Sequence, residues 1–208
     1  SLATADGSIY DVLSHEEAKI LAAGVSLAAS GAGRTVGQDG NALEVALSGS
    51  GALGATAAGS IFLHIAEGDA ALGRVAGGGD VEVSAQGSIT DGTQPGTALA
   101  NVAGRNIVLR SEFGTIGASG ADLRIDTDAA TGGQVQLRAG TGLFVNEVAG
   151  DLSMRSVVVE DEDAVASVFS AGRITNAAPA GTHVIEAARI RRYAEGDRGS
   201  QPATINSK

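Results

Sequence analysis

Short apolar segments recur along the chain at nearly even intervals, and apolar and polar residues alternate within each segment. In seven places an apolar residue stands at the centre of a phrase similar to Gly-Ser-Ile. The intervals between these centres are 27, 25, 28, 27, 27 and 31 residues. The centres are Ile9, Val36, Ile61, Ile89, Ile116, Leu143 and Ile174. Such alternation is typical of half-buried strands, and the near-constant step indicates a repeat.

Two further apolar clusters keep the same step. One lies ahead of the phrase, as in VEV at 81–83 and IVL at 107–109. The other follows it, as in DLRI at 122–125 and DLSM at 151–154. Each repeat therefore contains three short alternating segments separated by small or polar residues. The pattern predicts an all-β fold: a right-handed parallel β-helix, or solenoid, of about seven coils of about 27 residues with three strands per coil.

Stacked strands spaced about 4.8 Å apart would give a rod roughly 34 Å long. We expect the seven phrase centres to form one inward ladder. A second inward ladder would contain Leu43, Leu72, Leu99, Leu123 and Leu152. Five glycines ahead of the phrase are expected to supply positive φ angles at corners: Gly7, Gly59, Gly87, Gly114 and Gly172. A Gly-rich antiparallel domain is the alternative, but hairpins do not require a fixed step.

The repeat also sets the expected boundaries. Residues 1–6 form a lead-in segment, 7–190 the parallel β-helix and 191–208 a polar C-terminal tail or linker. In the first repeat, Ser14 and Glu17 have the spacing of a helix capping box. Because the residues that follow keep the strand step, we expect at most one helical turn near 14–17 and a strand from about residue 18.

Composition supports many short strands joined by tight turns. The chain has 31 glycines among 208 residues but only four Phe, two Tyr and no Trp, so its core must be aliphatic. The net charge of −10 and the lack of a basic run argue against a nucleic-acid partner. Because there is no cysteine, neither a disulfide scaffold nor a thiol site is available.

We expect neither a membrane helix nor a signal peptide in this sequence. The most apolar stretch, 18–32, is interrupted by polar residues and is shorter than the ~20 apolar residues that a membrane helix needs. Residues 1–15 lack the basic start and the apolar run of a signal peptide. An exported form of this protein would therefore be a mature chain or a piece of a larger one.

Three stretches carry a family resemblance: GDVEVSAQGSITDG (79–92), RNIVLRSEFGTIGASGADLRIDT (105–127) and AGTGLFVNEVAGDLSMRSV (139–157). They resemble the repeat regions of giant bacterial surface proteins of the filamentous-haemagglutinin and large-adhesin type. The resemblance covers roughly residues 7–190. It implies a secreted or cell-surface β-helical stalk, often one part of a very long chain. The calcium-binding nonapeptide repeats of some secreted relatives are absent here.

The sequence and the resemblance together predict a non-enzymatic structural or adhesive rod segment. Its expected partners are further β-helical coils of the same or neighbouring chains, and host or matrix glycans or proteins. No cofactor, catalytic residue, metal ligand, nucleic acid or membrane insertion is predicted. One alternative is a self-assembling subunit of an extracellular filament or surface layer, because no amphipathic helix caps either end and open strand edges favour end-to-end addition.

The acidic run Glu160, Asp161, Glu162 and Asp163 falls in the longest of the six intervals, from Leu143 to Ile174. We expect it to be an insertion of a few residues that bulges from a coil. It could bind a divalent cation or contact a partner, since clustered carboxylates are hard oxygen ligands. The sequence favours a second interpretation, in which the run is a solvated loop or discourages strand pairing beside the valines at 157–159.

A polysaccharide lyase or hydrolase is the remaining alternative, because such sites use outward carboxylates and basic side chains. The candidate residues would be Arg124, Asp126 and Asp128, with Asp122 and Asp151 near the same step, and Arg110 and Arg138, which follow one strand ladder a repeat apart and could stack. The lack of Trp and the scarcity of Tyr remove common platforms for sugar rings. No catalytic or metal role is expected for His15, His64 or His183, which fall in different repeats.

Overall fold

The strands of the computed structural model form two parallel sheets. It describes residues 1–12, 17–94, 96–128, 131–180, 182, 184–194 and 205–206. Sheet A contains β1 (Leu2–Thr4), β3 (Val25–Ala29), β5 (Leu53–Ala57), β7 (Ala70–Gly77), β9 (Ile89–Asp91), β10 (Val102–Gly104), β12 (Thr115–Ile116), β13 (Leu123–Thr127), β15 (Gly142–Glu147), β17 (Val165–Ser170) and β20 (Arg189–Ala194). Sheet B contains β2 (Ile20–Ala22), β4 (Leu43–Leu47), β6 (Ile61–Glu67), β8 (Val81–Ala85), β11 (Ile107–Ser111), β14 (Val135–Ala139), β16 (Leu152–Val159), β18 (Ile174–Asn176), β19 (Ile185–Glu186) and β21 (Ile205–Asn206).

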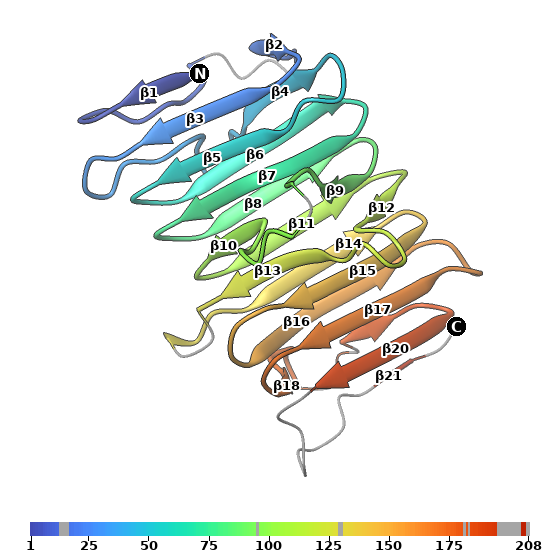
Figure 1. Cartoon of the computed structure of the whole chain (residues 1–208). Coiled ribbons are helices and arrows are strands. Elements are labelled where there is room, and N and C mark those ends of the chain that lie inside the picture. Colours follow the sequence, from blue (N-terminus) through green and yellow to red (C-terminus); the bar gives the residue numbers. More distant parts are fainter. Residues whose placement is uncertain are drawn as a thin grey trace.

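The coils stack in single file, with β1 and β2 at one end and β20 and β21 at the other (Figure 1). Neighbouring strands pair in parallel, as between β8 and β11 and between β11 and β14. The protein is therefore an all-β parallel β-solenoid, and the predicted fold class is confirmed. Within the described residues, no helix is long and apolar enough to cross a membrane.

The coils differ in length, and the predicted coils were slightly too few and too long. The solenoid has about eight turns of about 23 residues. The coil that runs from Ala55 to its partner Val75 is shorter than the next one, which runs from Val75 to its partner Val102. The longer coil contains β9 and an irregular arm at 92–101, of which 92–94 and 96–101 are described; the shorter coil lacks both. Irregular arms and additional short strands at corners thus lengthen some coils.

Three strands per coil is also not the general rule. Many coils have one strand in each sheet. The additional short strands β9, β12 and β18 join the same two sheets: β9 pairs with β7, β12 with β15 and β18 with β16. In the coils that contain the third segment of the repeat, this segment therefore extends one of the two sheets and does not form a third sheet.

The phrase centres point into the core, as predicted, but they do not form one ladder. All seven are buried. They belong to three separate runs: Ile9, Val36 and Ile61, which continue to Val81 in sheet B; Ile89, Ile116 and Leu143 in sheet A; and Ile174, which pairs with Leu152 in sheet B. Because the coil from Ile61 to Val81 is a short one, the next phrase arrives at a different corner.

The second predicted ladder is likewise divided. Leu43 pairs with Leu63 in sheet B, whereas Leu72 pairs with Leu53 in sheet A. Leu99 was expected to point inward, but it lies in the 92–101 arm and is 60% exposed. Because its neighbours in the sequence are also aliphatic, the sequence alone does not show that the alternation of inward and outward residues is interrupted in the arm.

The glycines ahead of the phrase have a different role from the predicted one. None of the five has a positive φ angle; the described glycines that do include Gly37 and Gly117, both at φ 70°. A Cβ atom on Gly59 would lie 2.7 Å from the carbonyl oxygen of Gly33, and one on Gly87 would lie 2.6 Å from that of Gly68. Gly59 and Gly87 are therefore needed for close approach between coils, which leaves no space for a side chain.

The serine of the phrase links successive coils. The Oγ atoms of Ser8, Ser60 and Ser88 each accept a hydrogen bond from a backbone N–H of the next coil, at 3.1 Å in every case. The three donors belong to Thr35, Asp80 and Thr115. The phrase therefore combines a glycine for close stacking, a serine for an inter-coil hydrogen bond and an aliphatic residue for the core.

Strand pairing reaches into both flanking segments. β1 pairs with β3, and β20 pairs with β17 as far as Ala194. The strand expected from residue 18 begins at Ile20. Most of the helical turn expected near 14–17 lies outside the described residues, as do 195–204 and 207–208 of the expected tail.

Gly87→Ala should destabilise the fold, because its Cβ would meet the backbone of the preceding coil. We expect the free energy of unfolding to fall by roughly 1–3 kcal/mol, as in other overpacked sites. The matched control is Gly54→Ala, whose Cβ would lie at an ordinary 3.5 Å from the nearest atom. The control should change stability by less than about 0.5 kcal/mol. Chemical denaturation followed by circular dichroism measures both, and equal effects would contradict the close-approach role.

Candidate functional site

A groove runs along the outer face of sheet B. It consists of three adjacent hollows of about 490, 460 and 330 Å³. The first and second share Asp39, Phe62 and Glu82, and the second and third share Val108 and Gln136. Because β6, β8, β11 and β14, which carry Phe62, Glu82, Val108 and Gln136, are successive strands of sheet B, the groove follows the direction in which the coils stack.

The alternation of the strands places polar side chains in this groove. In β6, Ile61, Leu63 and Ile65 point inward and are fully buried, so the intervening Phe62 and His64 point outward. The same alternation in the other strands of sheet B, combined with parallel register, aligns outward residues into rows. One row contains Glu44, His64, Ser84, Arg110 and Arg138, and the other contains Phe62, Glu82, Val108, Gln136 and Ser156. The predicted stacking of Arg110 on Arg138 is confirmed.

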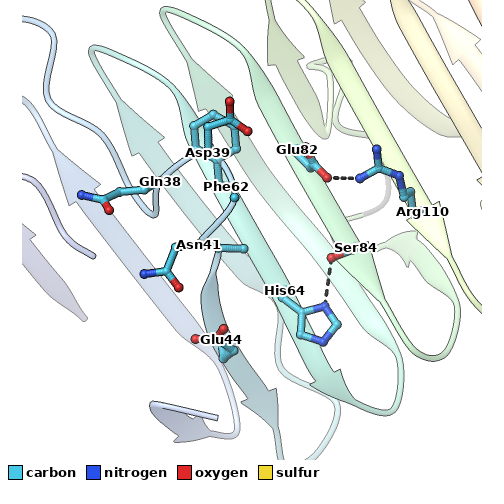
Figure 2. Close-up of a pocket in the computed structure, with 11 residues that line it drawn as sticks. Gln38, Asp39, Asn41, Glu44, Phe62, His64, Glu82, Ser84 and Arg110 are labelled. Atoms are coloured by element: carbon cyan, nitrogen blue, oxygen red, sulfur yellow. Dashed lines mark hydrogen bonds and ion pairs between the residues drawn. The ribbon is translucent and has the colours of Figure 1, made fainter. Parts of the chain in front are cut away.

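A tight turn forms one wall of the first hollow (Figure 2). The backbones of Gln38 and Asn41 exchange two hydrogen bonds of 3.0 Å. The turn needs left-handed backbone at Gly37 and Gly40, where φ is 70° and 73°. It brings the side chains of Gln38, Asp39 and Asn41 to the edge of the hollow.

Several groove side chains are already paired. His64 Nδ1 and Ser84 Oγ are 2.9 Å apart, and Arg110 forms an ion pair with Glu82 (Figure 2). Farther along the groove, Arg138 Nε donates to Glu160 Oε1 at 2.9 Å. These contacts hold the outward rows in place and leave few charges in the groove uncompensated.

Glu44 is one of the groove side chains that form no ion pair with another described residue. It lies on β4 opposite His64 and is only 8% exposed. Its Oε2 atom is buried and has no hydrogen-bond partner among the described residues. A buried carboxylate oxygen without a donor is costly. In the sequence, Glu44 lies inside the segment ALEV, where it has the position of an ordinary outward residue of a strand.

The residues of the hydrolase hypothesis are divided between the two sheets. Arg124 and Asp126 lie on β13 of sheet A, whereas Arg110 and Arg138 lie on β11 and β14 of sheet B. Asp128 is exposed beyond β13, and Asp151 Oδ1 accepts a hydrogen bond from the backbone N–H of Arg173 at 2.8 Å. Burial raises the pKa of Asp122.

Arg124 is part of a partly buried network that holds the 92–101 arm. It donates to Asp91 Oδ2 at 3.0 Å and to Thr93 Oγ1 at 2.6 Å. Asn101 is fully buried; its Nδ2 donates to Asp91 Oδ1 at 2.7 Å and to the Leu72 carbonyl oxygen at 3.0 Å, and its Oδ1 accepts from the Arg124 backbone N–H at 3.0 Å. Burial opposes ionisation of Asp91, but hydrogen bonds from Thr93 and Asn101 and the charge of Arg124 outweigh it and lower the pKa.

The acidic run forms the exposed corner between β16 and β17. The predicted insertion is wrong, because Glu147 pairs with Ser170 after 23 residues, the usual length of a coil. Glu160 binds Arg138, and Asp161 Oδ1 accepts from the backbone N–H of Asp163 at 2.8 Å. Across the described ranges, no three His, Asp or Glu side chains are grouped so that they could hold a metal ion. His15 and His183 lie outside those ranges.

Glu147 is a buried carboxyl at a corner of the solenoid. It is fully buried and accepts hydrogen bonds from the N–H and Oγ1 of Thr127, at 3.0 and 2.9 Å, and from the N–H of Ala149 at 3.3 Å. Burial raises its pKa to about 7 despite these donors, and the nearby charge of Asp126 adds to the increase. Glu147 therefore titrates near neutral pH.

Comparison with protein-family models, with curated proteins and with solved structures found no match to this chain. The parallel β-solenoid is thus established by the structure, whereas the resemblance to filamentous-haemagglutinin-like adhesins has no support from a family or a relative.

Glu147→Gln should change the pH dependence of stability. Native Glu147, with its pKa near 7, holds its proton between pH 4.5 and 7, whereas the unfolded chain has lost it, so the wild-type protein loses stability as pH rises through this window. The full effect is on the order of 3 kcal/mol. The stability of the variant minus that of the wild type should therefore increase from pH 4.5 to 7.5 in urea titrations. Parallel pH profiles would contradict the raised pKa.

Asn101→Ala should destabilise the protein by roughly 2–3 kcal/mol, because it leaves several buried polar groups without partners. Asn146→Ala is the control; Asn146 lies beside Arg124 in register but outside the network. Thermal and urea unfolding should show a small effect for the control. Limited proteolysis should cut the 92–101 arm faster in Asn101→Ala, and an unchanged cutting rate would argue against its anchoring role.

Proposed function

We propose that this chain is a non-enzymatic structural rod segment of a large secreted or cell-surface adhesin-like protein. Its role is mechanical: stacked coils keep distal parts at a distance and present a regular outer surface. Two observations support this role. The strands of successive coils pair in parallel, and one end of the stack has no covering coil among the described residues. The partners at that end would be further parallel coils.

The uncovered end is the N-terminal one. Leu2 of β1 pairs with Leu27 of β3 and belongs to the inward ladder. Leu27 is 2% exposed because coils cover it on both sides, whereas Leu2 is 49% exposed. A core position without its cover favours the addition of another coil.

The backbone at this end is also open. β1 and β2 are the terminal strands of their sheets, so each has one edge without a partner strand among the described residues. Tyr10, Val12 and Leu21 of the same coil are exposed large apolar side chains. An unpaired edge beside apolar surface is a template for strand addition.

The opposite end of sheet A differs. Arg192 of β20 pairs with Val168 of β17 and so takes an aliphatic position of the inward ladder. Its Nη1 is buried without a partner among the described residues. Charged residues that point inward at an edge discourage strand addition. The two ends are therefore unequal, and stacking is favoured at β1 and β2.

A self-assembling filament subunit is the second candidate, since a second copy could supply the covering coil. The same exposed Leu2 favours it. The two candidates differ in the longer protein: in a stalk, flanking coils of the same chain cover this end, so the long form stays monomeric. A long form that assembles into filaments would favour the second candidate.

Leu2→Lys should abolish association at the uncovered end. Sedimentation velocity of the wild-type segment at rising concentration should show larger species, because the apolar edge is open. Leu99→Lys is the control, because Leu99 is also exposed but lies in an arm far from the ends of the stack. The control should associate like the wild type. A wild-type segment that stays monomeric at all concentrations, or a control that also fails to associate, would contradict the stacking role.

A further inference from the structure

Glu44 marks a place in the first hollow where a donor is missing. The side chain is 8% exposed, and Oε2 has no hydrogen-bond partner among the described residues. Its neighbour His64 uses Nδ1 for Ser84. Lys19, whose backbone N–H donates to the Glu44 carbonyl oxygen, directs its ammonium group to Asp11 at 3.5 Å and to the Glu17 carbonyl oxygen at 2.8 Å. Since no described residue donates to Oε2, a ligand in the hollow that carries a donor would satisfy Glu44.

The charge of the hollow favours a cation. Its lining contains the carboxylates of Asp39, Glu44 and Glu82 but only one guanidinium, that of Arg110. Arg110 is paired with Glu82, which leaves Asp39 and Glu44 uncompensated. The carboxylates of the described residues are not grouped in a way that could hold a metal ion. An ammonium group, which needs only one carboxylate and forms a charge-assisted hydrogen bond, fits better.

The shape and the remaining side chains favour an extended, hydroxyl-rich chain. The groove continues from the first hollow past Gln136 and Ser156, whose side chains can both donate and accept hydrogen bonds. It also passes Arg105, Arg138 and Arg155, whose guanidinium groups donate hydrogen bonds, so the free amino group of a ligand is favoured at the first hollow. Phe62 offers an aromatic ring in the first hollow. The groove lies on the face of sheet B, where backbone groups are already paired, so a peptide could not add as a strand. Nucleic acid is disfavoured because its phosphates would meet carboxylates.

From these observations we propose that the groove binds a glycan chain that carries free amino groups. One ammonium group donates to Glu44 Oε2, a sugar ring lies against Phe62, and hydroxyl groups bond to Gln38, Asn41 and the polar side chains farther along the groove. This site goes beyond the proposed stacking role and does not depend on it, because Glu44 is on the face of sheet B whereas Leu2 is at the end of sheet A.

Isothermal titration calorimetry of the full chain with short oligomers of β-1,4-linked glucosamine tests this site. We expect saturable binding at a one-to-one ratio. Glu44→Gln should weaken it at least about tenfold, because it removes the charge-assisted bond. The thermal midpoint of Glu44→Gln should not fall, since a buried unpaired charge is lost, and this confirms that the variant is folded. Glu162→Gln, which removes a carboxylate from the exposed corner after β16, should retain the wild-type affinity.

Two further ligands separate the parts of the proposal. The N-acetylated oligomer of equal length has the same backbone without the charge, and a linear polyamine has the charge without the sugar. Both should bind much more weakly than the glucosamine oligomer. Equal binding of the acetylated oligomer would overturn the ammonium contact, and equal binding of the polyamine would overturn the glycan. If Glu162→Gln weakened the binding of the glucosamine oligomer as much as Glu44→Gln, the binding would be only a general electrostatic attraction to an acidic protein, and the proposed site would be wrong.

Discussion

The structure depends on one constraint: each coil must hydrogen-bond to the next at strand spacing around most of its circumference. At the corners, where side chains would keep coils apart, glycines such as Gly59 permit the close approach. At these corners, side chains also form hydrogen bonds between successive coils. The backbone N–H of Ser88 donates to Asp69 Oδ1 at 2.7 Å, while Ser88 Oγ accepts from the backbone N–H of Thr115 at 3.1 Å, so one serine connects three coils. Buried aliphatic rungs then fill the interior without large aromatic residues.

The same stacking generates the surfaces that could serve function. Parallel register repeats each outward position one coil further along, so the sheet B groove is a consequence of strand geometry together with the side chains that occupy its rows. Register also explains why Arg110 reaches Glu82 and Arg138 reaches Glu160, each across one coil boundary.

Buried polar groups account for the departures from regularity. Asn101 and its partners hold the 92–101 arm between β9 and β10, and Glu147 closes a corner next to Thr127. The Asn101 side chain has hydrogen-bond partners, and Glu147 titrates near neutral pH. Both follow from the cost of burying polar atoms without partners. The arms change the length of individual coils, which is why an almost even step in the sequence coexists with coils of unequal length.

The sequence by itself determined the all-β solenoid, the inward orientation of the phrase centres and the outward stacking of Arg110 on Arg138, because alternation and a repeat step are local properties that neighbouring coils share. It could not determine which rungs pair. The step from Ile61 to Ile89 looks like one coil, although Ile61 pairs with Val81 and Ile89 with Ile116. The sequence equally did not show that Leu99 is exposed, that Asn101 is buried, or that Glu44 Oε2 has no hydrogen-bond partner among the described residues. Whether such a residue is covered depends on the arms and coils packed beside it, and only the tertiary structure decides that.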